Sequence, residues 1–167
     1  TSQLTSELAE QKQKDIKNKV SEAVMANCTV KSLPESMVNK RLDEYMKYYE
    51  KRYASGNTSL SSVIQNNYGL SLDEFKQQVK SEIEAELKKQ IVFEAIAEDQ
   101  GMTVEQAGFD EYVNKLMSSN GFESKETMYK YYGDGSDPKT GEENLKTTYL
   151  SDKALDYCVS KAVINEK

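Results

Sequence analysis

The chain has 167 residues and a net charge of −6, with 30% charged residues, 37% apolar residues, 8 glycines and 2 prolines. This composition favours a soluble helical fold over a sheet-rich one, and the acidic balance disfavours a nucleic-acid partner. The chain has no histidine, which removes Ser-His-Asp and Cys-His catalytic systems and most zinc sites. We therefore expect no enzyme activity, cofactor or metal and, since no apolar run reaches bilayer length, no membrane partner.

Two helices are expected in the first third of the chain. Apolar residues recur at steps of three and four between Leu4 and Asn27, which predicts one amphipathic helix. A second helix is expected to open at Ser32 and Glu35, whose spacing is that of a capping box, and to end at the Ser-Gly-Asn sequence of residues 55–57. Its apolar positions include four tyrosines, which are Tyr45, Tyr48, Tyr49 and Tyr53.

The longest expected helix runs from Ser71 to Gly101, after a helical turn at 60–65 and a loop at 66–69. Ser71 and Glu74 have capping-box spacing, and Gly101 supplies a residue that can end the helix in a left-handed conformation. One apolar stripe follows its length, at Leu72, Phe75, Val79, Ile83, Leu87, Ile91 and Ala95. Such a helix is about 42 Å long, more than the roughly 30–35 Å width of a compact globule of this length, so we expect an elongated domain.

Two shorter helices are expected next. Thr103 and Gln106 have capping-box spacing, and the helix that they open is expected to stop at Asn120-Gly121. Ser124 is expected to cap a short helix over residues 125–132. No segment shows sustained period-two alternation, so the sequence predicts an all-α fold in which short connections make neighbouring helices antiparallel hairpins.

A loop rich in acids and glycine is expected at residues 133–144. It carries four carboxylates within ten residues, which suits calcium, but the EF-hand spacing is absent. A solvated loop with helix-capping acids is therefore favoured over a calcium site. Thr140 and Glu143 have capping-box spacing and are expected to open a last helix that reaches about Ile164.

The two cysteines, Cys28 and Cys158, lie near opposite ends of the chain and form no Cys-x-x-Cys motif. The favoured interpretation is that both are free thiols that behave as small apolar residues. A disulfide between the two terminal helices is the alternative.

Tyrosine is the unusual feature of the composition, with 11 tyrosines against 4 phenylalanines and no tryptophan. Adjacent helical residues point about 100° apart, so at least one of Tyr48 and Tyr49, and one of Tyr131 and Tyr132, should meet solvent or a partner. Tyrosine and methionine suit adaptable binding surfaces, whereas the alternative is that half-buried tyrosines edge a helical hairpin. The candidate contact residues are Met37, Tyr45, Tyr48, Tyr49, Tyr53, Met117, Phe122, Tyr129, Tyr131 and Tyr132.

Several short stretches, in this order and spacing, carry a resemblance to a known family. They are 33–38 (LPESMV), 74–83 (EFKQQVKSEI), 101–104 (GMTV), 120–121 (NG), 126–132 (ETMYKYY) and 162–167 (AVINEK). Together they resemble the carboxy-terminal domain of bacterial trigger factor, a ribosome-associated chaperone. Periplasmic chaperones of the SurA type are a looser relative.

This resemblance implies a single all-helical domain over residues 1–167, with a body and two projecting arms that cradle unfolded or nascent polypeptides in the cytoplasm. It implies no isomerase or ribosome-binding domain within the chain, although an upstream signal or domain is compatible with a first residue other than Met. The loop at 133–144 is longer than we expect for the family.

Two other functions remain open at the level of sequence. The chain could be a structural module whose apolar faces meet a second copy in a homodimer. It could also be a helical accessory domain of a larger peptidyl-prolyl isomerase, with the chemistry outside these residues.

Overall fold

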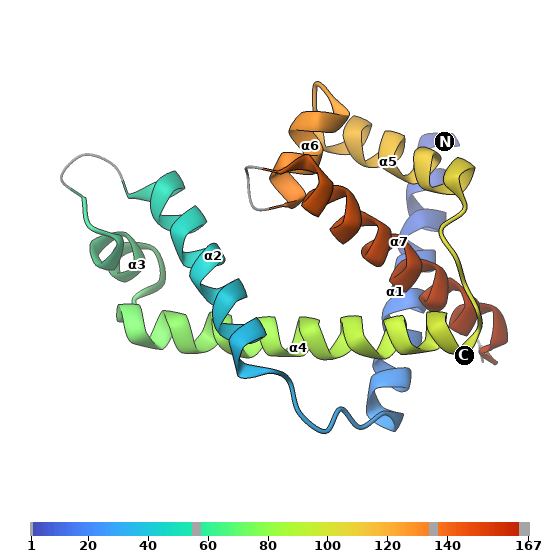
Figure 1. Ribbon diagram of the computed structural model, residues 1–167, viewed down its shortest axis with the longest axis horizontal. Coiled ribbons are helices and arrows are strands. Elements are labelled where there is room, and N and C mark those ends of the chain that lie inside the picture. The colour runs from blue at the N-terminus through green and yellow to red at the C-terminus, as the bar shows by residue number, and fades with distance from the viewer. Residues whose placement is uncertain (1, 55–57, 134–136, 164–167) are drawn as a thin grey trace. The chain divides into compact units, whose positions relative to one another are not determined.

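The computed structural model describes residues 2–54, 58–133 and 137–163, with side chains from Leu8 onward. Within these ranges it has helices and no strand, which confirms the all-α prediction (Figure 1). None of the helices in these ranges combines the length and the apolar composition that a membrane-spanning segment needs. The helices are α1 (Ser2–Asn27), α2 (Glu35–Tyr53), α3 (Leu60–Tyr68), α4 (Leu72–Asp99), α5 (Gln106–Asn120), α6 (Lys125–Tyr132) and α7 (Pro138–Lys161).

The helices belong to two compact units. Unit 1 comprises Thr1–Cys28 and Gln90–Lys167, and unit 2 comprises Thr29–Lys89, so the boundary falls inside α4. The prediction of one elongated domain with projecting arms stays a prediction, because this division does not test whether the units fold together.

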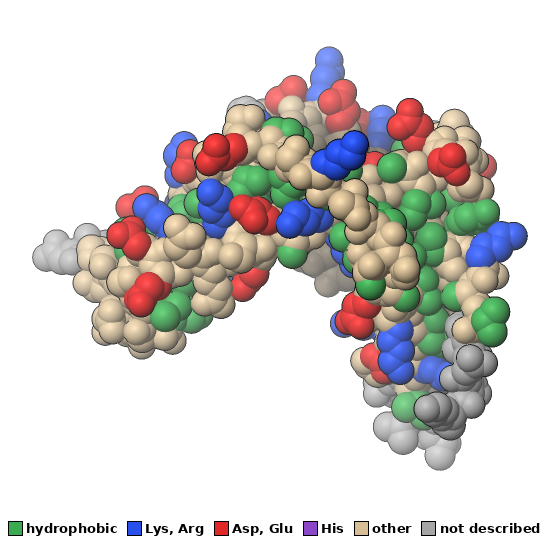
Figure 2. Space-filling view, turned by 90° about the horizontal axis from the view of Figure 1, so that it is seen from below, with side chains coloured by type: hydrophobic (Ala, Val, Ile, Leu, Met, Phe, Trp, Pro, Cys, Tyr) green, Lys and Arg blue, Asp and Glu red, His purple; other side chains and the backbone are tan. Residues whose placement is uncertain are grey.

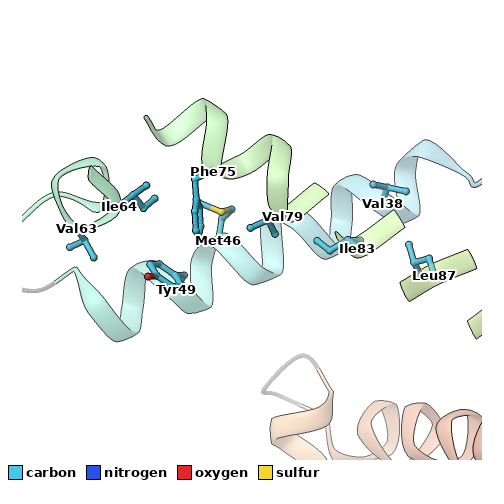
Figure 3. Close-up of a cluster of buried hydrophobic side chains, with 9 residues drawn as sticks. All are labelled: Val38, Met46, Tyr49, Val63, Ile64, Phe75, Val79, Ile83 and Leu87. Atoms are coloured by element: carbon cyan, nitrogen blue, oxygen red, sulfur yellow. The ribbon is translucent and has the colours of Figure 1, made fainter. Parts of the chain in front are cut away.

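The core of unit 2 lies where α2 and α3 pack against the first part of α4 (Figure 3). The predicted stripe of α4 is confirmed here, since Phe75, Val79, Ile83 and Leu87 are all buried. Their partners are Val38, Met46 and Tyr49 from α2 and Val63 and Ile64 from α3. Periodicity alone therefore identified the α4 side of this core.

Unit 1 contains two further clusters of buried side chains. In the first, α5, α6 and α7 meet around Phe109, Val113, Met128 and Leu145. In the second, Phe93 and Ala97 of α4 pack with Ala154 and Leu155 of α7, and Val20 and Val24 of α1 lie against them.

The second half of α4 buries different residues from those predicted. The stripe was expected to continue through Ile91 and Ala95, but Ala95 is exposed, whereas Val92, Phe93 and Ala97 are buried. The prediction assumed one partner surface along the whole helix. In fact α4 packs against α2 and α3 in unit 2 and against α1 and α7 in unit 1. The residues of α4 that are buried therefore lie on a different face of the helix in each unit.

Both predicted ends of α4 are confirmed in atomic detail. The Ser71 amide donates to Glu74 Oε2 at 2.8 Å, and the Glu74 amide donates to Ser71 Oγ at 3.3 Å, which is a complete capping box. At the other end Gly101 has a φ of 61°. There the Met102 amide donates to the Ala97 carbonyl at 2.8 Å, which satisfies a carbonyl of the last turn.

A Ser71→Ala substitution is expected to lower the free energy of unfolding by about 1 kcal/mol. It removes the N-terminal cap of α4, which contributes buried side chains to both units. Urea denaturation followed by circular dichroism measures the loss. Ser32→Ala is the matched control and should change stability by less than about 0.5 kcal/mol, since Ser32 caps no helix. Equal losses in the two variants would contradict the role of the Ser71 cap.

Two other predicted capping boxes, at the starts of α2 and α5, are wrong. These helices begin later than the boxes require, with Pro34 and Glu105 as their N-cap residues, and neither residue makes a side-chain cap hydrogen bond. The pairs concerned are Ser32–Glu35 and Thr103–Gln106. In both cases a serine or threonine with correct spacing lies outside the helix that forms.

The start of α7 also differs from its prediction. Asp137 is the N-cap, and its Oδ1 accepts from the Lys139 amide at 3.0 Å, while Pro138 occupies the first turn. The box predicted for Thr140 and Glu143 is therefore wrong, because both residues already lie inside α7. An aspartate-proline pair is the stronger start signal, since proline has the φ of a first turn and no amide to satisfy.

Two boundaries differ by a few residues. The turn expected at 60–65 is the full helix α3, which takes up the first residues of the loop predicted at 66–69 and ends at Gly69 with a φ of 69°. The last helix ends at Lys161, and its predicted end, Ile164, lies outside the described residues, as does the predicted end of α2 at 55–57. The ends predicted for α5 and α6 agree with the structure.

Candidate functional site

Four of the ten candidate contact residues lie exposed on α2, and we call them the tyrosine ledge. Met37, Tyr45, Tyr48 and Tyr53 are between 41% and 46% exposed. Tyr45, Tyr48 and Tyr53 lie within three turns of one helix, so their exposed rings are grouped and not scattered singly over the surface. The ledge therefore offers aromatic surface with hydroxyl groups to whatever contacts unit 2.

Tyr49 differs from the other α2 candidates because it is 6% exposed and belongs to the core of unit 2 (Figure 3). Its ring lies 4.5 Å from that of Tyr53 and 6.1 Å from that of Tyr45, between ring centroids. Of the adjacent pair Tyr48 and Tyr49, one is thus exposed and one buried, as helical geometry required. Tyr49 supports the ledge from beneath and offers no free surface of its own.

Arg52 orders the exposed rings of the ledge. Its guanidinium carbon lies 6.0 Å from the Tyr48 ring centroid and 5.7 Å from that of Tyr53, and Nη1 donates to the Tyr48 hydroxyl at 3.1 Å. The contact holds two rings with one cation, which limits their rotamer freedom. Sequence analysis missed Arg52, although its i,i+4 spacing from Tyr48 was a usable signal.

Tyr68 is a second residue that sequence reasoning missed, because it was assigned to a loop. It is the last residue of α3, is 52% exposed, and its hydroxyl lies 2.9 Å from that of Tyr49. Its ring centroid is 5.1 Å from that of Phe75. Tyr68 therefore extends the aromatic surface of unit 2 from α2 onto α3.

Stability is expected to fall as the pH rises from about 10 to about 12, because burial, followed by the hydrogen bond to Tyr68, raises the pKa of Tyr49 to about 12. In this window the unfolded chain has lost a proton that the folded chain keeps, so deprotonation favours unfolding. The urea midpoint across this pH range measures the fall. Burial beside Asp152 likewise raises the pKa of Tyr112 to about 12, and burial also raises the pKa of Tyr45 and of Tyr129, so Tyr49 is one of several sources of the fall.

Substitutions isolate the contribution of Tyr49. Tyr49→Phe removes one raised pKa and should make the fall smaller, while Tyr48→Phe leaves the buried hydroxyl in place and should keep the full fall. A fall of the same size in Tyr49→Phe and in the parent chain would contradict the assignment to Tyr49.

The remaining candidates lie in unit 1, around the turn between α5 and α6. Tyr131 is 58% exposed, whereas Phe122 and Tyr132 are half-buried. The ring centroids lie 5.3 Å apart for Phe122 and Tyr131 and 5.2 Å apart for Tyr131 and Tyr132. We call these three residues the aromatic corner. Met117 and Tyr129, also candidates, are half-buried and pack against the adjacent core.

The two groups of candidates are thus each brought together locally, the ledge in unit 2 and the aromatic corner in unit 1. Charged side chains of both signs surround hydrophobic ones on the face drawn in Figure 2. Such a surface combines apolar contact area with the charge that keeps a protein in solution.

The loop predicted at 133–144 is wrong in its second half, because residues 138–144 already belong to α7. Asp134, Gly135 and Ser136 lie outside the described residues. Asp137 caps α7, and Glu142 pairs with Lys146 at 2.5 Å. Nowhere in the described residues do three or more Cys, Asp or Glu side chains form a group that could hold a metal ion.

Comparison with known proteins identifies the family. The family model described as bacterial trigger factor protein (TF) C-terminus matches residues 1–160. The chain belongs to the family of trigger factor carboxy-terminal domains. The resemblance found in the sequence is thereby confirmed.

Curated trigger factors are similar to most of the chain. The protein from Syntrophomonas wolfei is 27% identical over 161 residues, which are 96% of this chain and 35% of that protein. The proteins from Macrococcus caseolyticus and Agathobacter rectalis are each 26% identical, over 93% and 74% of this chain. The chain thus spans about a third of these trigger factors or less. No solved structure gives a significant match.

Proposed function

We propose that this chain is a chaperone domain that holds unfolded or nascent polypeptides. The observation that carries the proposal is the tyrosine ledge, since Tyr45, Tyr48 and Tyr53 stay exposed on one helix while Tyr49 between them is buried. Membership in the trigger factor family supports it and does not favour the alternatives of a structural module or an isomerase accessory domain. The proposal includes the expected cytoplasmic location and assigns no catalytic step to these residues.

The proposed mechanism is passive holding. Exposed rings of the ledge and of the aromatic corner cover apolar segments of a client, and tyrosine hydroxyls accept or donate hydrogen bonds along its backbone. Because each contact is small, binding at one patch is weak and reversible, and two patches on one chain raise the effective concentration of the second contact. Surrounding charges of both signs keep the loaded chain soluble.

Suppression of aggregation tests this function. A chemically unfolded client is diluted into buffer and its light scattering followed, with this chain added in rising molar ratio and albumin as control. We expect suppression beyond that of albumin, and a clear loss of it in a Tyr45→Ser, Tyr48→Ser double variant. Asn39→Ser, an exposed polar change on the same helix, is the matched control and should keep full activity.

Three outcomes would contradict the proposal. They are no suppression by the parent chain, equal suppression by the double variant and the parent, and equal loss in Asn39→Ser. Tyr131→Ser tests the aromatic corner separately in the same assay. Sedimentation over a concentration series distinguishes holding from dimerisation, because a dimer formed through the ledge would dissociate in the double variant.

A further inference from the structure

Two thiols line one groove in unit 1, and the proposed function uses neither of them. Both cysteines are free, as the favoured interpretation of the sequence predicted, but Cys28 is exposed and does not pack as a small apolar residue. The groove has a volume of about 490 Å³ and is formed by the last turns of α1 and of α7. Its lining includes Val20 and Val24 from α1, Tyr157 from α7, and both Cys28 and Cys158.

Cys28 is the accessible thiol of the pair. It is exposed and follows directly on α1, and its amide donates to the Met25 carbonyl at 3.3 Å, which is at the long end for a backbone hydrogen bond. Residues 28–34 are not helical. Cys28 therefore lies at the start of a non-helical segment, just outside α1.

Cys158 is the shielded thiol. It lies one turn before the end of α7, half-buried, and packs against the cluster around Phe93 and Ala97. Burial raises the pKa of the Cys158 thiol, and the charge of Cys28 adds to the rise.

We propose that Cys28 and Cys158 form a reversible intramolecular disulfide by exchange with small-molecule disulfides. A disulfide requires Cα atoms within about 4.4–6.8 Å, so its formation requires the non-helical backbone after α1 to bring Cys28 into that range of Cys158 within the shared groove. The bond would fasten the start of the segment that joins α1 to α2 onto α7.

The exchange proceeds in two balanced steps. The Cys28 thiolate attacks one sulfur of the reagent, the reagent S–S bond breaks, and one thiolate leaves and takes a proton from water. The Cys158 thiol then loses its proton to solvent and attacks Cys28 Sγ in the mixed disulfide, which releases the second reagent thiol. In sum two protein thiols are oxidised and one small disulfide is reduced to two thiols.

The test is incubation of the chain with hydroxyethyl disulfide, followed by acid quenching and intact-mass measurement. We expect a monomer lighter by two hydrogens, with no reagent attached and no free thiol. The ratio of this product to the mixed disulfide should be at least about tenfold higher for the folded chain than in guanidinium, because only the folded chain brings both thiols to one groove.

Single variants identify the order of the steps. Cys158→Ser should accumulate the mixed disulfide at Cys28, and Cys28→Ser should react several-fold more slowly, since only the shielded thiol remains. Stable reagent adducts on both cysteines of the parent chain, disulfide-linked dimers, or an equal product ratio in guanidinium would each overturn the proposal.

Discussion

A Gly141→Ala substitution is expected to lower the free energy of unfolding by about 3 kcal/mol. Alanine inside a helix is normally about 1 kcal/mol more favourable than glycine, so the expected sign is reversed. The reason is the contact between α6 and α7, where Gly141 is buried. A Cβ there would lie 2.9 Å from Tyr129 Cα and closer still to its carbonyl group. These are backbone atoms, so relief requires a shift of a whole helix.

Urea denaturation followed by circular dichroism measures this loss. Thr140→Ala is the matched control, because Thr140 is the exposed neighbour on the same turn of α7, and its effect should stay within about 0.5 kcal/mol. If Gly141→Ala were as stable as the parent chain, the close approach of α6 and α7 would be wrong.

Phe109→Ala is expected to cost about 4 kcal/mol, the largest loss from any single truncation proposed for this chain. Phe109 is 1% exposed at the centre of the core formed by α5, α6 and α7. Its ring centroid lies 5.8 Å from that of Tyr149, in an edge-to-face arrangement. Truncation leaves a cavity beside Val113 and Met128, which are both fully buried. Because this cavity has an apolar lining, water does not fill it.

The matched control for Phe109→Ala is Tyr131→Ala, which removes an aromatic ring from an exposed position of the same unit. Its loss should remain below about 1 kcal/mol, because the ring is already 58% exposed. The free energy of unfolding of both variants is measured from the midpoint and slope of urea denaturation. Comparable losses would contradict the prediction that the cost of removing a ring in unit 1 depends on its burial.

The position of most helices was predictable, because apolar spacing and glycine are local signals. The stripe from Phe75 to Leu87 and the end at Gly101 needed no knowledge of the rest of the chain. Capping boxes were a weaker signal. Serine, threonine, glutamate and glutamine are common in this sequence, so pairs such as Thr103 and Gln106 reach the correct spacing without capping anything.

The candidate site was predictable only in part. The spacing of Tyr48 and Tyr49 required that one of them be exposed, but which one depends on where α4 lies against α2, and that is a tertiary contact. The same limit explains why Tyr49 was included among the contact residues and why Tyr68 and Arg52 were missed. Ring contacts between α2 and α3 bring Tyr68 to Tyr49, and no local pattern encodes them.

Unit 1 is assembled from both ends of the chain, whereas unit 2 is one continuous stretch. During synthesis from the amino terminus, unit 2 is therefore complete while α7 is still unmade. The apolar residues Val20 and Val24 of α1 therefore meet Ala154 and Leu155 only once α7 has been made. Until then this apolar face of α1 lacks its partner helix and is open to contact with other chains.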